Sequence, residues 1–456
     1  MAGELSEGTS RLGRWPTSPV PLWMVARRSI VTRSHPLLFG PLANSYPVTQ
    51  NLDPSSLRRD HTMNRRDFWI QSTYATAAVA GLARLVQAED DADGEADQSD
   101  KDVQKDMKLR QMPDYSSTPA KLLTGSTPRQ DGFYFPAEWE EHESTIMVMP
   151  TMQNWKGYGI PLEDVRGQWA DVANTLSEYE PVLMVVPQEE LRQAKKLLAK
   201  EIKLVEFAVN DGWARDTGPM VLVNGKGERR VAGFTFNGWG AKFPPYNDDA
   251  LLKARLCHHL DLPMYPIDLV LEGGAVSVDG EGTVLTTEQC LLHPTRNSAN
   301  DRERVERVLN ESLGTTKVIW LGKGLEPDPI TDGHIDGIAA FIEPGVVLVH
   351  VCEDTSDPNH QICRDAVRRL KEATDAKGRK LEVVELPLDS ELSHMNFYIG
   401  NGCVLVPIAK KRDEGKRPLG ILRELFKDRK VIGIDGTVLG AGGGGIHCIT
   451  QQVPKV

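Results

Sequence analysis

The segment from residue 144 to residue 187 begins with STIMVMP (144–150) and ends with PVLMVVP (181–187), and it decides the fold class. Both ends are short Val- and Met-rich runs that stop at proline, which is typical of buried β-strands. Between them, residues 162–179 space their apolar side chains at three and four, as an amphipathic helix does. This strand–helix–strand order predicts an α/β structure.

The same alternation continues to the C-terminus and predicts a single α/β domain over residues 125–456. Its size favours a barrel or a propeller-like repetition, and the likeness of VVLVHV to GCVLVP indicates repeated units. The further predicted strands are KLVEFAV (203–209), PMVLVNG (219–225), TVLTT (283–287), KVIWLG (317–322), VVLVHV (346–351), GCVLVPIA (402–409) and KVIGIDG (430–436). The further predicted helices are residues 188–201, 247–261, 297–314, 360–378 and 417–428.

The N-terminal quarter has a different character. Residues 1–62 lack periodicity and are expected to be a non-native or disordered leader. Residues 63–88 place Arg65 and Arg66 before an Ala-rich apolar run that ends in VQA, which is typical of a twin-arginine export signal. We therefore expect Met63 to be the start and the protein to be periplasmic or extracytoplasmic, or cytoplasmic if the signal is not used. A membrane anchor or a surface helix is the alternative, but the run is short for a membrane span.

Residues 89–124 are predicted to be an acidic disordered linker, because residues 89–106 carry nine acidic and two basic side chains. Of the formal net charge of −11, residues 1–106 account for only −2, so −9 falls on the rest of the chain. A domain with this charge repels phosphate backbones and suits cationic substrates, which argues against a nucleic-acid partner. The six cysteines show no zinc-like spacing and are too few for a disulfide scaffold.

The loop NDGWARDTGP (210–219) places Trp213 three residues before Asp216. An aromatic face beside a carboxylate suits a planar cation, whereas the alternative is a structural turn in which Arg215 pairs with Asp216. In LEGGAV (271–276), Glu272 precedes two glycines in an apolar run. Its carboxylate is costly to bury unless it is paired, and the alternative is a β-bulge at a sheet edge.

The segment TDGHIDGIAAF contains His334 and Asp336, which project on the same face if the chain is extended there. Zinc is disfavoured, because no further ligand with suitable spacing is nearby. In GAGGGGIHCITQQVP (440–454), Cys448 follows four glycines. The run is either a disordered tail or a loop that provides space, and Cys448 is either a buried apolar residue or a reactive thiol.

Together NDGWARDTGP, EGGAVSVDGEGTVLTTEQCLL, FNGWGAKFP, TDGHIDGIAAF, NFYIGNGCVLVP and GGGGIHCITQQVP resemble the agmatine deiminase family, which includes bacterial peptidylarginine deiminases. The likeness extends from Phe133 to the C-terminus. It implies a pentein fold, a propeller of five ββαβ-type units, and guanidine hydrolysis without metal or other cofactor. From agmatine the products would be N-carbamoylputrescine and ammonia, as in putrescine biosynthesis.

The resemblance also implies roles for the residues above. Cys448 matches the nucleophile that forms a thiouronium intermediate, and His334 matches the general acid and base. Asp216 and Asp336 match the carboxylates that grip the guanidinium group. The other matches are Glu272 as a further acid of the site and Trp213 as its aromatic wall, while Gly442 and Gly443 would leave room for the substrate.

Three positions depart from the family pattern: Gly445, where Asn is common, Gly337, where Asn or another polar residue is common, and His394, where an aromatic is usual. Arginines that would hold a substrate carboxylate are missing from residues 234–249, which offer only Lys242 and therefore favour agmatine. The export signal instead favours a deiminase of peptidyl or free arginine that makes citrulline. A non-catalytic guanidine-binding protein and an amidinotransferase are further alternatives, and an oligomer is compatible with all of them.

Overall fold

The computed structural model describes residues 108–151, 160–298, 301–390, 392–409 and 415–456, all within one compact unit, Thr62–Val456. The predicted leader, the export signal and residues 89–107 of the predicted linker lie outside the described residues. No helix in the described part of the chain is long and apolar enough to cross a membrane.

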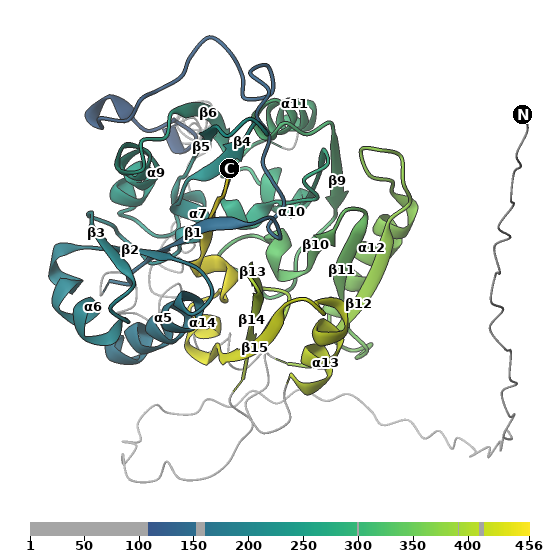
Figure 1. Ribbon diagram of the computed structural model, residues 1–456. Coiled ribbons are helices and arrows are strands. Elements are labelled where there is room, and N and C mark those ends of the chain that lie inside the picture. Colours follow the sequence, from purple (N-terminus) through teal and green to yellow (C-terminus); the bar gives the residue numbers. More distant parts are fainter. Residues whose placement is uncertain (1–107, 152–159, 299–300, 391, 410–414) are drawn as a thin grey trace, which may run out of the picture. The chain divides into compact units, whose positions relative to one another are not determined.

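The described chain is an α/β structure whose strands form five separate mixed sheets (Figure 1). Four sheets have three strands each, consecutive in the sequence. Their strands are β4 (Met220–Val223), β5 (Arg229–Thr235) and β6 (Met264–Val270); β7 (Ser277–Val278), β8 (Thr283–Thr287) and β9 (Lys317–Leu321); β10 (Ala339–Glu343), β11 (Val346–Val351) and β12 (Glu382–Pro387); and β13 (Tyr398–Gly400), β14 (Cys403–Ile408) and β15 (Lys430–Asp435).

The fifth sheet joins the first strand of the described chain to the last. Its order is β16 (Gln451–Pro454), β1 (His142–Val148), β2 (Val182–Val186) and β3 (Lys203–Glu206). In every sheet an antiparallel pair is followed by a parallel pair, so the same pattern recurs five times in the described residues. Since β16 pairs with β1, the last residues of the chain complete a sheet that the first strand begins.

Helices provide the parallel crossovers, because parallel neighbours cannot be joined by a tight turn. The longer helices are α5 (Leu162–Ser177), α6 (Leu191–Leu197), α9 (Asn247–His259), α11 (Arg302–Leu313), α12 (Asn359–Glu372) and α13 (Lys416–Leu425). The short ones are η2 (Tyr115–Ser117), η3 (Gln188–Glu190), α7 (Ala214–Thr217), α8 (Gly238–Ala241), η4 (Gly273–Ala275), α10 (Glu288–Leu291), η6 (Ile335–Gly337), α14 (Thr437–Ala441) and η7 (His447–Ile449).

Helix α12 illustrates how the sequence pattern produces this packing. Its buried residues Cys363, Ala366 and Leu370 are spaced at three and four, which places them on one helical face. That face packs against Val347 and Val349 of β11 in a common apolar cluster, and Figure 1 shows the helix beside this sheet. Full burial of a leucine contributes about 1.5–3 kcal/mol, so packing rather than helix propensity holds α12 in place.

All nine strands predicted from apolar runs are present, as β1 to β4, β8, β9, β11, β14 and β15. Seven further strands of the described chain were not predicted. They are short or contain polar residues, as β16 shows: its Gln451 and Gln452 are buried and pair with β1. The C-terminal stretch is therefore a packed strand and not a tail.

The packed domain also begins earlier than the expected boundary at residue 125. Tyr115 is buried, and Leu122 forms an isolated bridge to Met264 of β6. Residues 108–124 carry enough apolar side chains to pack, whereas the strongly acidic composition ends at residue 106. The predicted linker, residues 89–124, therefore included residues 108–124, which belong to the packed domain.

Candidate active site

The six side chains singled out from the sequence lie at turns and short helices between strands. Each of them is less than one tenth exposed. They are Trp213 and Asp216 at α7, Glu272 just after β6, His334 and Asp336 at η6, and Cys448 in η7.

Gly274 in η4 is the point at which three of these side chains meet. A β-carbon built on Gly274 would lie 2.6 Å from Nδ1 of His334, 2.7 Å from Oδ2 of Asp336 and 3.2 Å from Oδ1 of Asp216. The Gly274 N–H donates a hydrogen bond to Asp216 Oδ1 at 3.0 Å. An imidazole and two carboxylates therefore converge on Gly274, a position without a side chain.

This geometry predicts a large effect for Gly274→Ala. The added methyl group would force His334 and Asp336 to shift, and a displacement of 1 Å in a catalytic site can cost about 10²-fold in rate. We expect kcat/KM, measured by ammonia release, to fall by about that factor. Gly420→Ala on α13 is the matched control, because a β-carbon there meets nothing within 4 Å. Equal loss in both variants, or none in Gly274→Ala, would contradict the assignment.

Cys448 lies within reach of the same group. Its Sγ is 3.6 Å from Oδ2 of Asp336. Cys448, His334 and Asp336 all line a cavity of about 100 Å³. The backbone N–H of Cys448 donates to Oδ1 of Asn396 at 3.3 Å, which fixes the short helix η7 that carries the thiol.

The environment keeps the Cys448 thiol protonated in the absence of a cation. Burial, Asp336 and Asp216 raise the pKa of Cys448 well above its usual value. The backbone of Gly445 and the side chain of Asn396 lower that pKa, but their effect is smaller. A cation bound between the thiol and the carboxylates would reverse the balance.

His447, the neighbour of Cys448, holds Asp336 in place. Its Nδ1 lies 2.9 Å from Oδ2 of Asp336 and its Nε2 lies 2.9 Å from Oε2 of Glu138. Arg215 donates to the same Glu138 oxygen at 3.0 Å. Burial and Arg215 alone would lower the pKa of His447, but the two carboxylates raise it, so the protonated ring donates to both. Burial would raise the pKa of Asp336, whereas the hydrogen bond from His447 lowers it and keeps Asp336 ionised.

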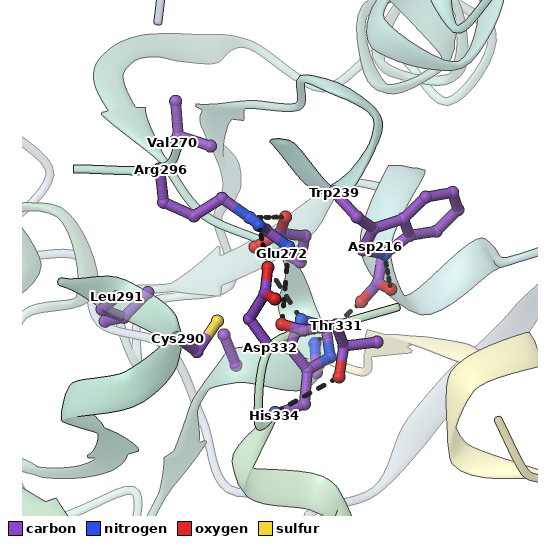
Figure 2. A network of polar contacts seen from close by, with 12 residues as sticks. Asp216, Trp239, Val270, Glu272, Cys290, Leu291, Arg296, Thr331, Asp332 and His334 are labelled. Atoms are coloured by element: carbon purple, nitrogen blue, oxygen red, sulfur yellow. Dashed lines mark hydrogen bonds and ion pairs between the residues drawn. The ribbon is translucent and has the colours of Figure 1, made fainter. Parts of the chain in front are cut away.

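Glu272 is fully buried and paired with Arg296. It lies after the end of β6 and immediately before η4, so the alternative of a β-bulge within a strand is wrong. Arg296 donates from Nε to Glu272 Oε1 at 2.7 Å and from Nη1 to Asp332 Oδ2 at 2.6 Å (Figure 2). Burial alone would raise the pKa of Glu272, but Arg296 and His334 hold it at about 2. Lys242, the one basic residue of 234–249, also contacts Asp332, at 2.6 Å.

The backbone around His334 and Asp336 is not extended, contrary to what the sequence led us to expect. They do not lie on an extended strand; His334 precedes the 3₁₀ helix η6 and Asp336 lies inside it. Burial would lower the pKa of His334, but Asp216, Cys290 and Glu272 together raise it well above its usual value. The ring is therefore protonated near neutral pH and can act as a proton donor.

Two tryptophans shape the other side of the site. Trp213 packs edge-to-face on Trp169 at 5.5 Å, and a β-carbon on Gly444 would lie 2.5 Å from the Trp213 ring. Trp239 donates from Nε1 to Asp216 Oδ2 at 2.9 Å, as Figure 2 shows. Asp216 thus pairs with Trp239 and Gly274, and the alternative of a structural Arg215–Asp216 turn is wrong, since Arg215 bonds to Glu138.

The glycine run provides the space that the loop interpretation required. Gly443 and Gly444 line the cavity beside Cys448, and Gly443 adopts a positive φ of 87°. Gly442 ends α14 and is not among the lining residues. At Gly445 a β-carbon would lie 2.6 Å from Oδ1 of Asn396. A side chain at position 445 would therefore require Asn396 to shift.

Sequence reasoning missed the residues that hold the site together. They come from distant segments: Glu138, Trp239, Arg296, Asp332, Asn396 and His447. Four of them lie within the family motifs quoted above (FNGWGAKFP, TDGHIDGIAAF, NFYIGNGCVLVP and GGGGIHCITQQVP), but the sequence assigned none of them a role. The signal that could have indicated Arg296 is the cost of burying Glu272, which requires a partner of opposite charge.

The thiol of Cys448, the imidazole of His334 and the carboxylate of Asp336 line one small cavity, and this set of groups suits nucleophilic chemistry on a cationic group. Residues 134–454 match the family model described as Porphyromonas-type peptidyl-arginine deiminase, and the chain belongs to this family. It is thus a hydrolase that acts on carbon–nitrogen bonds of linear amidines.

Individual relatives agree with this assignment. A protein of Streptomyces avermitilis, provisionally named an agmatine deiminase, is 42% identical over 72% of this chain and 99% of its own. The structure of an Enterococcus faecalis agmatine deiminase is similar with a TM-score of 0.70 and 36% identity, over 74% of this chain and 100% of that one. The structure of a C. jejuni agmatine deiminase with substrate bound has a TM-score of 0.64 and 27% identity, over 71% and 96%.

Proposed function

We propose that this protein hydrolyses the guanidinium group of agmatine to N-carbamoylputrescine and ammonia. The observation that carries the proposal is the convergence of His334, Asp216 and Asp336 on Gly274, with the Cys448 thiol 3.6 Å from Asp336. Two carboxylates beside a thiol would place a guanidinium carbon next to sulfur. The names of the relatives support the same substrate.

In the proposed reaction, Asp216 and Asp336 hold the guanidinium nitrogens and the bound cation lowers the pKa of Cys448. The thiolate attacks the guanidinium carbon and forms a tetrahedral adduct. His334 donates its proton to the departing nitrogen. Loss of ammonia then converts the adduct into a thiouronium bound to Cys448. Neutral His334 then takes a proton from water, which attacks the same carbon and releases the ureido product and Cys448.

The contacts of Lys242 favour agmatine over arginine. Lys242 is the only cation in residues 234–249, and it donates to Ile330 O at 2.9 Å as well as to Asp332. A free or peptidyl arginine would bring a carboxylate or carbonyl that needs a donor, and Lys242 is already engaged. Agmatine lacks that group.

The deciding experiment is ammonia release from agmatine, free arginine and an arginine-terminated peptide at equal concentrations. We expect kcat/KM for agmatine to exceed the other two by about 10²-fold or more, because a misfitting polar group at the far end must be desolvated without a partner. Faster turnover of the peptide would overturn the choice of agmatine but not the deiminase chemistry. Absence of ammonia with all three would overturn the proposed function itself.

We also propose that the five sheets are the units of a pentein propeller around this site. Support comes from the recurring antiparallel and parallel pairing, and from the position of the site residues at connections of different sheets. The pairing of β16 with β1 would close such a ring.

Export by the twin-arginine route remains a proposal that rests on Arg65, Arg66 and the apolar run before Ala88. N-terminal sequencing of the mature protein tests it. Cleavage after Ala88 would support export, and a mature chain that retains Arg65 would contradict it.

A further inference from the structure

Cys290 is a second buried thiol at the site, and the proposed reaction does not use it. It lies in α10 and is fully buried. Its Sγ, a carboxylate oxygen of Glu272 and a ring nitrogen of His334 all lie within 4.8 Å of one another (Figure 2). Three different ligand types, from three segments of the chain, thus surround one point.

The polar atoms that face this point are unsatisfied. Glu272 Oε2 and both ring nitrogens of His334 are buried and have no hydrogen-bond partner among the described residues. The separation between His334 Nε2 and Glu272 Oε2 is 3.8 Å, too long for a hydrogen bond. The two groups are thus in ion-pair contact but not hydrogen-bonded, and because buried polar atoms normally have hydrogen-bond partners, the missing partner is consistent with a bound ion.

We propose that Glu272, Cys290 and His334 form an inhibitory site for a divalent cation of the Zn²⁺ class. Thiolate, imidazole and carboxylate together are the ligands that Zn²⁺ takes in proteins, whereas Mg²⁺ and Ca²⁺ prefer oxygen alone. Three protein ligands leave the fourth position to water. On binding, the metal takes the Cys290 thiolate, Glu272 Oε2 and a neutral His334 nitrogen, and the displaced protons pass to solvent.

The surroundings support this site and give it a route of access. Arg296 donates to the other oxygen of Glu272, so it orients Oε2 towards the metal position. His334 lines the cavity beside Cys448, so an ion can enter by the path that the substrate takes. The inhibitory effect rests on the proposed function: a metal on His334 removes the proton donor and repels the guanidinium cation.

The first test measures binding without activity. Metal-free protein is titrated with Zn²⁺ against a chromophoric chelator, and with Co²⁺ to detect the thiolate-to-metal absorption band. We expect one Zn²⁺ per chain and a thiolate band in the wild type and in Cys448→Ala. Cys290→Ala should bind Zn²⁺ at least about tenfold more weakly and lose the band. Cys363→Ala, another buried cysteine on α12, is the control and should match the wild type.

The second test compares ammonia release with and without Zn²⁺ for each variant. Zn²⁺ should inhibit the wild type reversibly, with recovery on addition of EDTA, and Cys290→Ala should need at least about tenfold more Zn²⁺. Near-UV circular dichroism confirms that each variant is folded. If Cys290→Ala does not fold, Glu272→Gln takes its place in the binding test, with the same expected weakening.

The outcomes separate this proposal from the proposed function. Loss of Zn²⁺ binding in Cys448→Ala but not in Cys290→Ala would place the metal on the nucleophile and overturn the site. Binding at Cys290 without inhibition of an active enzyme would overturn the inhibitory role. Wild-type protein that binds Zn²⁺ through Cys290 but releases no ammonia would support the site and refute the deiminase function.

Discussion

Replacing Cys448 with alanine is expected to lower kcat for agmatine by about 10⁴-fold or more. The proposed reaction passes through a covalent bond to this sulfur, and removal of a nucleophile in other covalent hydrolases costs on the order of 10⁴–10⁶-fold. Cys448 is 6% exposed at the edge of a cavity, so alanine should be accommodated without unfolding. The measurement is ammonia release, with thermal unfolding to confirm the native state.

Cys363→Ala serves as the matched control, because it removes another buried thiol, 85 positions away in the chain. Its kcat for agmatine should be close to that of the wild type. Mass spectrometry provides a second readout: a covalent adduct of the substrate should be trapped by acid quenching in the wild type only. Equal ammonia release by the wild type and Cys448→Ala would refute the mechanism.

Replacing Arg296 with methionine is expected to lower the free energy of unfolding by about 3 kcal/mol at neutral pH. The Arg296 and Glu272 side chains are both 0% exposed, and removal of Arg296 leaves the buried carboxylate with only the imidazole of His334, 3.8 Å away, as a charged partner. Asp332 keeps Lys242 as a partner, so the loss arises mainly at Glu272. Denaturant unfolding followed by fluorescence gives the value.

Two comparisons make this prediction specific. Arg302→Met breaks two surface pairs, with Glu288 and Glu306, in which the side chains are 44%, 30% and 39% exposed, and should change the unfolding free energy by at most about 1 kcal/mol. The double variant with Glu272→Leu and Arg296→Met removes both buried charges and should recover much of the loss. If Glu272→Leu does not restore stability to Arg296→Met, the destabilisation comes from lost packing and not from the unpaired charge.

The pH dependence of the Arg296→Met effect follows from Glu272. In the wild type its pKa is lowered from 4.5 to about 2, so its stabilising contribution is complete above pH 4.5 and is lost as the pH falls towards 2. Without Arg296, burial raises this pKa, and protonation relieves the buried charge. The difference in unfolding free energy between the two proteins should therefore be greatest near neutral pH and shrink below pH 4.5.

Local patterns in the sequence predicted much of the fold. Apolar runs located nine strands, and the spacing at three and four located α5, α9, α11, α12 and α13. Strands such as β16 were missed because Gln451 and Gln452 are polar, and only their pairing with β1 buries them. Strand periodicity describes a strand with one apolar face, and it does not detect a strand whose polar side chains are enclosed by the rest of the fold.

For the site, the sequence by itself determined which groups are present: the thiol of Cys448, the imidazole of His334 and the carboxylates of Asp216, Glu272 and Asp336. These depend on residue type and on motifs that can be read along the chain. Motif likeness also determined the family.

Tertiary structure alone decided how these groups act. It places Gly274 where three of them meet, pairs Glu272 with Arg296, fixes Asp336 with His447, and brings Cys290 to His334. Protonation states depend on burial and on the distance to other charges, and both arise from contacts between residues far apart in the sequence. The order of residues along a chain cannot specify those distances until the sheets have packed.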